Sequence, residues 1–204
     1  SNSTAGYLRL SGTTDTSFGG VLTDGTAGGV LAILKTGTGK VTWSNSANDQ
    51  TGPVFVYAGI LEASGSGAGS GKIMLGSTNR VGARAFGTYQ NTGSGSLDEK
   101  ATLAAFYGGV IKGTNLTEDN LRDQVQVMAS GRLQFDSSGD IPGSGRVLDG
   151  AQAGAVLAAG YAMDNAFLQR VKESFKGTVA LAADSSNNLD FSSASGLNSA
   201  DVRL

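Results

Sequence analysis

The sequence predicts an all-β fold, and within that class a solenoid of short strands. Glycine is abundant, at 32 of 204 residues, whereas proline occurs only twice. Short runs that alternate apolar and polar residues recur from one end of the chain to the other, as in half-buried strands. Gly, Ser, Asn and Asp separate these runs, and few two-residue hairpin turns join them. Short strands joined by polar corners fit coils that pair in parallel with the next coil.

The alternating runs predict the strands and the residues on their inner faces. The first run, 7–10, places Leu8 and Leu10 on one face, and "GGVLAILK" is apolar on both faces, as in a strand covered on both sides. Further runs place the following residues on common faces: Val41 with Trp43, Val54 with Val56, Ile73 with Leu75, Val81 with Ala83 and Ala85, Val125 with Val127, Leu133 with Phe135, Val179 with Leu181 and Ala183, Leu189 with Phe191, and Val202 with Leu204.

Two stretches favour short helical insertions. In 164–176, Asp164 is suited to cap a helix N-terminus and Gly177 to end the helix, with apolar residues at helical spacing between them. In 96–108, Ser96 and Glu99 form a capping-box pattern, yet "ATLAAFYGGVI" is equally compatible with a strand. One helical turn is a further option at Thr117.

The stretch 34–63 contains, in this order, Leu34-Lys35, Gly37-x-Gly39, a strand with Val41, a corner with Asn48, Thr51-Gly52, a second strand, and Ala58-Gly59-x-Leu61. In this order of elements the stretch resembles the autotransporter-associated β-strand repeat. Trp43 stands where the family usually has Leu, Pro53 replaces a Gly, and the usual Tyr of the corner is missing. The matching residues are Leu34, Lys35, Gly37, Gly39, Val41, Asn48, Thr51, Gly52, Val54, Val56, Ala58, Gly59 and Leu61.

The resemblance implies a right-handed parallel β-helix in an extracellular or surface-displayed bacterial protein. Residues 1–204 are then one β-helix segment, expected to belong to a longer chain, with a structural or adhesive role as a stalk, fibre or display scaffold. The implied partners are adjacent coils of the same parent protein, with self-association as an option. The β-helix reading also puts Val41, Trp43, Val54, Val56, Leu61 and Ala63 inside and the Gly and Asn residues at corners. The alternative is a carbohydrate-active β-helix enzyme, a lyase or hydrolase.

Composition argues against several function classes. Charged residues make up 16% of the chain at a net charge of −2, without the clustered Lys and Arg of a nucleic-acid surface. Cys and His are absent, which removes thiolate sites, the commonest metal ligand and the commonest general base. No apolar run has the roughly 20 residues of a membrane helix. We therefore expect no cofactor, no metal, no nucleic acid and no membrane insertion by this segment.

Carboxylates provide the candidate catalytic groups, but their spacing favours ordinary surface positions. The candidates are Asp98 with Glu99, Glu118 with Asp119 and Asp123, and Asp136 with Asp140. Adjacent residues of a strand point to opposite faces, so Asp98 and Glu99 do not converge there as glycoside hydrolysis requires. The stretch 184–190 lacks the Gly and Glu of a calcium loop, and Ile73 replaces the Ser/Thr of a phosphate loop in "GSGAGSGK". We expect no catalytic residues.

One surface is a candidate interaction patch. If Val54, Val56 and Leu61 face inward, alternation directs Phe55, Tyr57 and Ile60 outward, and three large apolar residues so close together need a cover. The cover is either the predicted helix 164–176, which we favour, or a neighbouring copy or domain. We also expect both ends of the segment to be open coils with unpaired strand edges.

Overall fold

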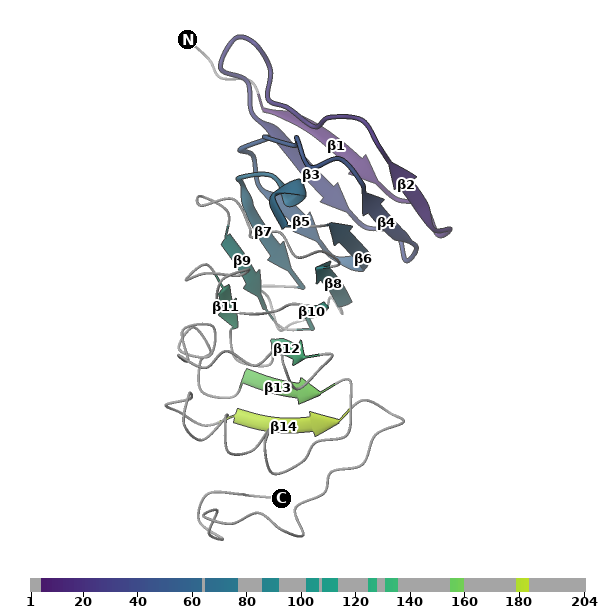
Figure 1. The fold of residues 1–204 in the computed structure, drawn as a ribbon, viewed down its shortest axis with the longest axis vertical. Helices are drawn as coiled ribbons and strands as arrows, with labels where there is room; N and C mark the ends of the chain where they lie inside the picture. Colours follow the sequence, from purple (N-terminus) through teal and green to yellow (C-terminus); the bar gives the residue numbers. More distant parts are fainter. Residues whose placement is uncertain are drawn as a thin grey trace, which may run out of the picture.

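The computed structural model describes residues 5–63, 65–76, 86–91, 102–106, 108–113, 125–127, 131–135, 155–159 and 179–183. These residues form two sheets whose strands stack one below another from the N-terminal end of the molecule downward (Figure 1). The first sheet, sheet A, consists in spatial order of β1 (Gly6–Leu10), β3 (Leu31–Lys35), β5 (Val54–Val56), β7 (Lys72–Leu75), β9 (Thr102–Ala105) and β11 (Val125–Val127).

The second sheet, sheet B, contains the remaining described strands. In spatial order it consists of β2 (Thr16–Phe18), β4 (Lys40–Trp43), β6 (Ala58–Ala63), β8 (Phe86–Asn91), β10 (Val110–Gly113), β12 (Arg132–Phe135), β13 (Ala155–Ala159) and β14 (Val179–Ala183). The chain thus alternates between the sheets from β1 to β12. Every pairing among the described strands is parallel, as the sequence predicts.

The spacing between paired strands shows how the chain advances. Gly6 pairs with Leu31, Ile33 with Val54, and Lys72 with Thr102, so one circuit of the two sheets takes about 20 to 30 residues. Each circuit adds one strand to each sheet and buries its apolar side chains against the circuits on either side. Such a unit cannot bury its faces alone, so neighbouring circuits stabilise one another.

Aliphatic side chains from successive strands form the interior. On sheet A, a continuous row runs from Leu8 on β1 to Leu103 on β9, and Ile33, Val54, Ile73 and Leu103 within it are fully buried. On sheet B, Leu61, Tyr89 and Ile111 form a matching buried row. Each fully buried aliphatic side chain contributes about 1.5–3 kcal/mol.

The structure confirms most of the inward positions. Trp43, Val54, Val56, Leu61 and Ala63 are buried, whereas Val41 is only half-buried. Val41 pairs on one side with Thr16 of β2, the last strand of sheet B at this end, so little lies beyond it. The apolar stretch over β3 is also covered on both faces: Ile33 is buried inward and Ala32 outward.

The helical option for residues 96–108 is wrong where the structure describes that stretch, because Thr102–Ala105 is strand β9. Leu103 and Ala105 point inward beside Ile73 and Leu75, which requires a period of two. The one described helix is a short 3₁₀ turn, η1 (Gly65–Ala68), in the glycine-rich corner before β7. The predicted helix 164–176 and the turn at Thr117 lie outside the described residues.

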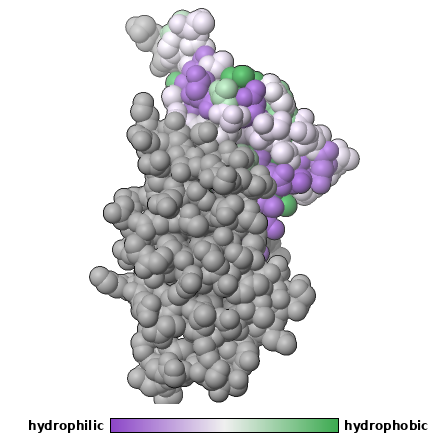
Figure 2. All heavy atoms as spheres, in the orientation of Figure 1, coloured by the Kyte–Doolittle hydropathy of each residue, from purple (hydrophilic) through white to green (hydrophobic). Residues whose placement is uncertain are grey.

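At the N-terminal end of the described structure, each sheet ends in a strand with one described neighbour. Strands β1 and β2 are the first strands of their sheets, and all three residues of β2 are exposed, Phe18 among them. In the view of Figure 2, this end presents mainly hydrophilic and neutral residues, with hydrophobic ones in small groups. The predicted strand with Val202 and Leu204, at the other end, lies outside the described residues.

Candidate interaction face

Strand β5 and the residue that follows the strand position the aromatic part of the predicted patch. In β5 the side chains of Val54 and Val56 point inward, so Phe55 between them lies on the outer face of sheet A. The backbone amide of Tyr57 donates to the carbonyl of Lys35 at 2.9 Å, which extends the parallel ladder one residue beyond β5. The rings of Phe55 and Tyr57 stack, with centroids 6.0 Å apart and planes inclined by 29°. Phe55 is half-buried and Tyr57 is 39% exposed.

Ile60, the third predicted patch residue, lies on the other sheet. It belongs to β6 and pairs with Lys40 and Thr88 on sheet B. The chain turns from sheet A to sheet B between Tyr57 and Ile60, with Gly59 at a φ of 69°. The structure therefore brings Phe55 and Tyr57 together and places half-buried Ile60 apart from them. The role of these residues as an interaction patch stays a prediction, and their predicted cover, helix 164–176, lies outside the described residues.

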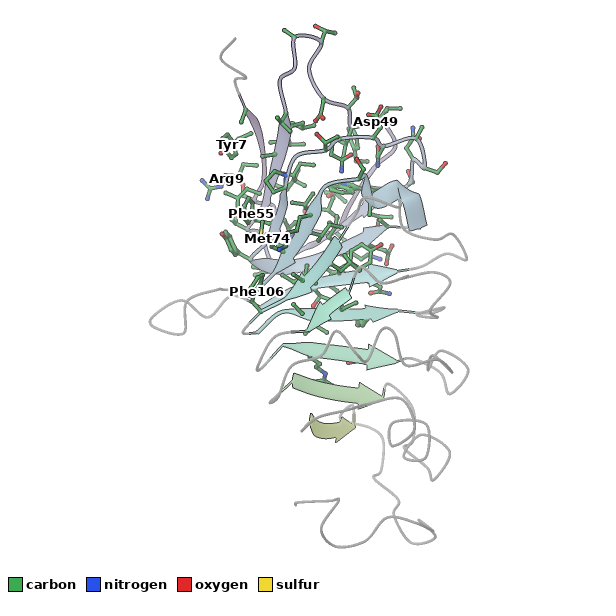
Figure 3. All side chains as sticks on the ribbon, turned by 90° about the vertical axis from the view of Figure 1, so that its left-hand side faces the viewer. Tyr7, Arg9, Asp49, Phe55, Met74 and Phe106 are labelled. Carbon is green, nitrogen blue, oxygen red and sulfur yellow. The ribbon has the colours of Figure 1, made fainter. Side chains whose placement is uncertain are left out.

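The outer face of sheet A carries further large side chains that were not predicted as part of the patch. Phe55 lies in register between Leu34 on β3 and Met74 on β7, and both are half-buried. Tyr7 on β1 is 75% exposed, and Phe106 directly follows β9. Figure 3 shows Tyr7, Arg9, Phe55, Met74 and Phe106 along one side of the molecule. We call this surface the aromatic face; its members are Tyr7, Arg9, Leu34, Phe55, Tyr57, Lys72, Met74 and Phe106.

The aromatic face has a one-sided charge. Arg9 and Lys72 are exposed on its strands, and no strand of sheet A contains an Asp or Glu. Within the described part of the chain, neither cation forms an ion pair; the salt bridge found there joins Lys40 Nζ to Glu62 Oε2 at 3.2 Å on sheet B. Exposed cations without neighbouring acids favour anionic partners.

A buried lysine fastens the corner between the two sheets. Lys35 points inward from β3, is 1% exposed, and donates from Nζ to the carbonyl oxygens of Gly37 and, at 3.1 Å, Ala58. Burial lowers the pKa of this amine below its ordinary value, although the charge of Asp15 acts in the opposite direction. The carbonyl groups at this corner thus accept hydrogen bonds from Lys35 where the strand ladder ends. This arrangement is structural, because the amine is enclosed.

The opposite corner is held by Asn48 and Asp24. Asn48 accepts from the Leu22 amide and donates to the Gly67 carbonyl, both at 2.8 Å, and so joins three successive circuits. Asp24 accepts from the Leu31 amide and from Thr51. Partial desolvation raises the pKa of Asp24, but these hydrogen bonds outweigh it and the net pKa is lowered. Asn48 therefore occupies a corner, as the sequence predicts.

The residues considered for catalysis or calcium binding lie outside the described residues. This holds for the three groups of carboxylates between Asp98 and Asp140 and for the stretch 184–190. Among the described residues, no cluster of three His, Cys, Asp or Glu side chains could hold a metal ion. Lys72, the lysine of the glycine-rich "GSGAGSGK", begins strand β7. A phosphate loop requires a helix there.

No described helix has the length and apolar character needed to cross a membrane. The chain matches no protein-family model, and no similar curated protein or solved structure was found.

Proposed function

We propose that the chain is a right-handed parallel β-helix segment of an extracellular or surface-displayed bacterial protein, and that it serves as a stalk, fibre or display scaffold. The observation that carries the proposal is the alternation of parallel strands between two continuous sheets. A crossover between parallel strands of one sheet is right-handed in about 98% of cases, which gives the hand of the coil. Stacked circuits extend along one direction and present long, regular outer faces, as a stalk or scaffold requires.

The roles of the repeat residues support membership of the autotransporter-associated β-strand repeat family. Lys35 supplies a donor to the corner, Asn48 joins successive circuits, and Gly59 takes the backbone conformation that turns the chain into sheet B. These positions are among those that match the repeat. Each meets a need of a coil corner rather than of a reaction.

Localisation is the first test of this function. Antibodies against the chain are applied to intact cells of the bacterium that encodes it, and external protease is used to remove exposed protein. We expect labelling of intact cells, loss of label after protease, and retention of a cytoplasmic control protein. Label that appears only after the cells are broken open would contradict the proposal.

Turnover of polysaccharides decides between the scaffold and the enzyme alternative. We expect no release of reducing ends or unsaturated sugars from a panel of purified polysaccharides. Release that is abolished by Asp98→Asn, Glu99→Gln, Asp136→Asn or Asp140→Asn would establish a carbohydrate-active enzyme instead.

A further inference from the structure

Three of the four aromatic rings on sheet A, those of Tyr7, Phe55 and Phe106, lie on alternate strands and follow one diagonal. Tyr7 is on β1, Phe55 on β5, and Phe106 directly after β9. Strands β1, β5 and β9 are separated by β3 and β7 in sheet A. Because neighbouring strands are about 4.8 Å apart, consecutive rings are separated by roughly 10 Å along the stack.

The register shows that each step also moves along the strands. Arg9 pairs with Leu34, and Leu34 with Phe55, so Phe55 lies two residues further along its strand than Tyr7 does. In the same way, Phe55 pairs with Met74 and Met74 with Ala104, which places Phe106 two residues further again. The amide of Phe106 donates to the Leu75 carbonyl at 2.9 Å, so the ladder still holds at Phe106. Two residues span roughly 6.6 Å, which makes each diagonal step roughly 12 Å.

Cations flank this diagonal on both sides. Arg9 belongs to the row Arg9–Leu34–Phe55–Met74, on one side of the diagonal. Lys72 pairs with Thr102 two residues before that row, on the other side of the diagonal. Both side chains are exposed, and the described strands of sheet A contain no Asp or Glu that could neutralise them. A second copy docking face to face would bring these cations together, so the charge disfavours self-association through this face.

We propose that the aromatic face binds an extended acidic polysaccharide, a polymer with carboxylate-bearing sugars, laid along the diagonal Tyr7–Phe55–Phe106. Tyr7, which is 75% exposed, and the half-buried rings of Phe55 and Phe106 offer flat apolar surface to the faces of sugar rings, and Arg9 and Lys72 meet the carboxylates. A rigid row of rings at a regular step fits a polymer with a regular repeat. A protein partner would instead be anchored by a cluster of side chains in a well-packed pocket.

This inference rests on the proposed function because it requires the continuous outer face that sheet A presents in a solenoid. It gives the adhesive role a ligand class and assigns the recognition to Tyr7, Phe55 and Phe106 as stacking platforms. Tyr57, stacked on Phe55, holds that ring on the outer face and offers its own exposed edge to the same ligand.

Calorimetric titration with polygalacturonate fragments tests the inference. We expect saturable binding that weakens as salt is raised, because exposed cations are screened. Tyr7→Ser is expected to weaken binding about three- to tenfold, and Arg9→Gln with Lys72→Gln to weaken it further and to reduce the salt dependence. Val21→Ser removes an exposed apolar residue outside sheet A, and Lys112→Gln removes a lysine on sheet B; both controls should bind as the parent chain does.

Two comparison ligands separate acidic sugars from other partners. A neutral glucan should bind much more weakly than polygalacturonate, and poly-glutamate should bind without sensitivity to Tyr7→Ser. Equal binding of the neutral glucan, binding of poly-glutamate with the same sensitivity to Tyr7→Ser, or face variants that bind polygalacturonate like the parent would overturn the inference.

Circular dichroism and the fluorescence of buried Trp43 are recorded for each protein. A parent chain that retains β structure and a buried Trp43 yet fails to bind polygalacturonate would overturn the ligand inference while leaving the proposed scaffold intact. Loss of β structure in the parent chain would contradict the scaffold itself.

Discussion

Tyr89 carries a polar group into the apolar interior. Its side chain is fully buried on β8 between Leu61 and Ile111, and its hydroxyl has no hydrogen-bond partner among the described residues. Burial raises the pKa of the phenol well above its ordinary value, so the group stays neutral. An unpaired buried hydroxyl costs about 1–3 kcal/mol relative to its hydration in the unfolded chain.

Tyr89→Phe should therefore increase the free energy of unfolding, by about 1–3 kcal/mol, because it removes the unpaired hydroxyl and keeps the ring. Tyr89→Ala should lower it by about 3–5 kcal/mol, since it leaves a cavity between stacked strands. Urea denaturation measures both changes. A loss of more than about 1 kcal/mol in Tyr89→Phe would show that the hydroxyl has a partner.

The amine of Lys35 makes stability depend on pH. Its pKa in the folded protein lies below the ordinary 10.5, chiefly because of burial. Between the lowered pKa and 10.5, the unfolded chain binds more protons than the folded one, so the contribution of Lys35 to stability rises with pH in that window. The unfolding free energy of the parent minus that of Lys35→Met should thus increase as pH is raised from 7 toward 10.5. Urea denaturation measures it at each pH.

Lys72→Met, which removes an exposed lysine, serves as the control for this pH series. A difference between the parent and Lys35→Met that shrinks over the same pH range would contradict the burial of a charged amine at this corner.

Alternation predicts which apolar residues of a strand point inward, but it leaves Lys35 unrecognised. A lysine is almost never fully buried unless its charge has partners, and sequence alone favours an exposed side chain. Lys35 is buried because it shares the inward face of β3 with Ile33 and finds carbonyl groups at the corner. Those carbonyls come from residues 37 and 58, and only the fold brings them together.

At the scale of single elements, the corner after β5 depends on Gly59. Its φ of 69° lies in the left-handed region, and a Cβ at this position would be 2.5 Å from the Gly37 carbonyl oxygen. Gly28 has a similar φ of 76° but open space around it. The pair therefore separates the conformational cost of a side chain from its steric cost.

Gly28→Ala should lower the free energy of unfolding by about 1–2 kcal/mol, through backbone conformation alone. Gly59→Ala adds a clash with backbone atoms that cannot move freely, and should lower it by on the order of 3–5 kcal/mol. Thermal and urea denaturation of the two variants give the comparison. Equal losses of unfolding free energy in the two variants would mean that Gly59 is less closely surrounded than the structure shows.

Residues 102–105 illustrate the limit of pattern analysis for short elements. The run "TLAA" follows a capping-box pattern and suits a helix by composition, yet it forms strand β9. Pairing with β7 decides the outcome, because Leu103 and Ala105 fill the space beside Ile73 and Leu75. Tertiary contacts of this kind override local preference, and a sequence of four residues does not reveal them.

At the scale of the whole molecule, the all-β class and parallel pairing follow from the sequence, whereas the register does not. Period-two runs with polar corners predict β1, β4, β5, β7 and several later strands. The corners differ in length, so the number of residues between paired positions varies along the chain. It is smaller for Val54 and Ile73 than for Lys72 and Thr102. For this reason Phe55 and Tyr57 are predictable as outward residues, but their alignment with Tyr7 and Phe106 is not.

Sheet B is one continuous parallel ladder from β2 to β14, and pulsed electron-electron distance measurement tests this continuity most directly. Ser17, Lys112 and Ala182 lie in a single row of sheet B that passes through Thr42, Glu62, Gln90, Gln134 and Ala158. With spin labels at cysteines introduced in pairs, we expect about 19 Å between positions 17 and 112, four strands apart, and about 34 Å between positions 17 and 182, seven strands apart, each broadened by the label linkers. Distances that fail to increase with the number of intervening strands would contradict the account.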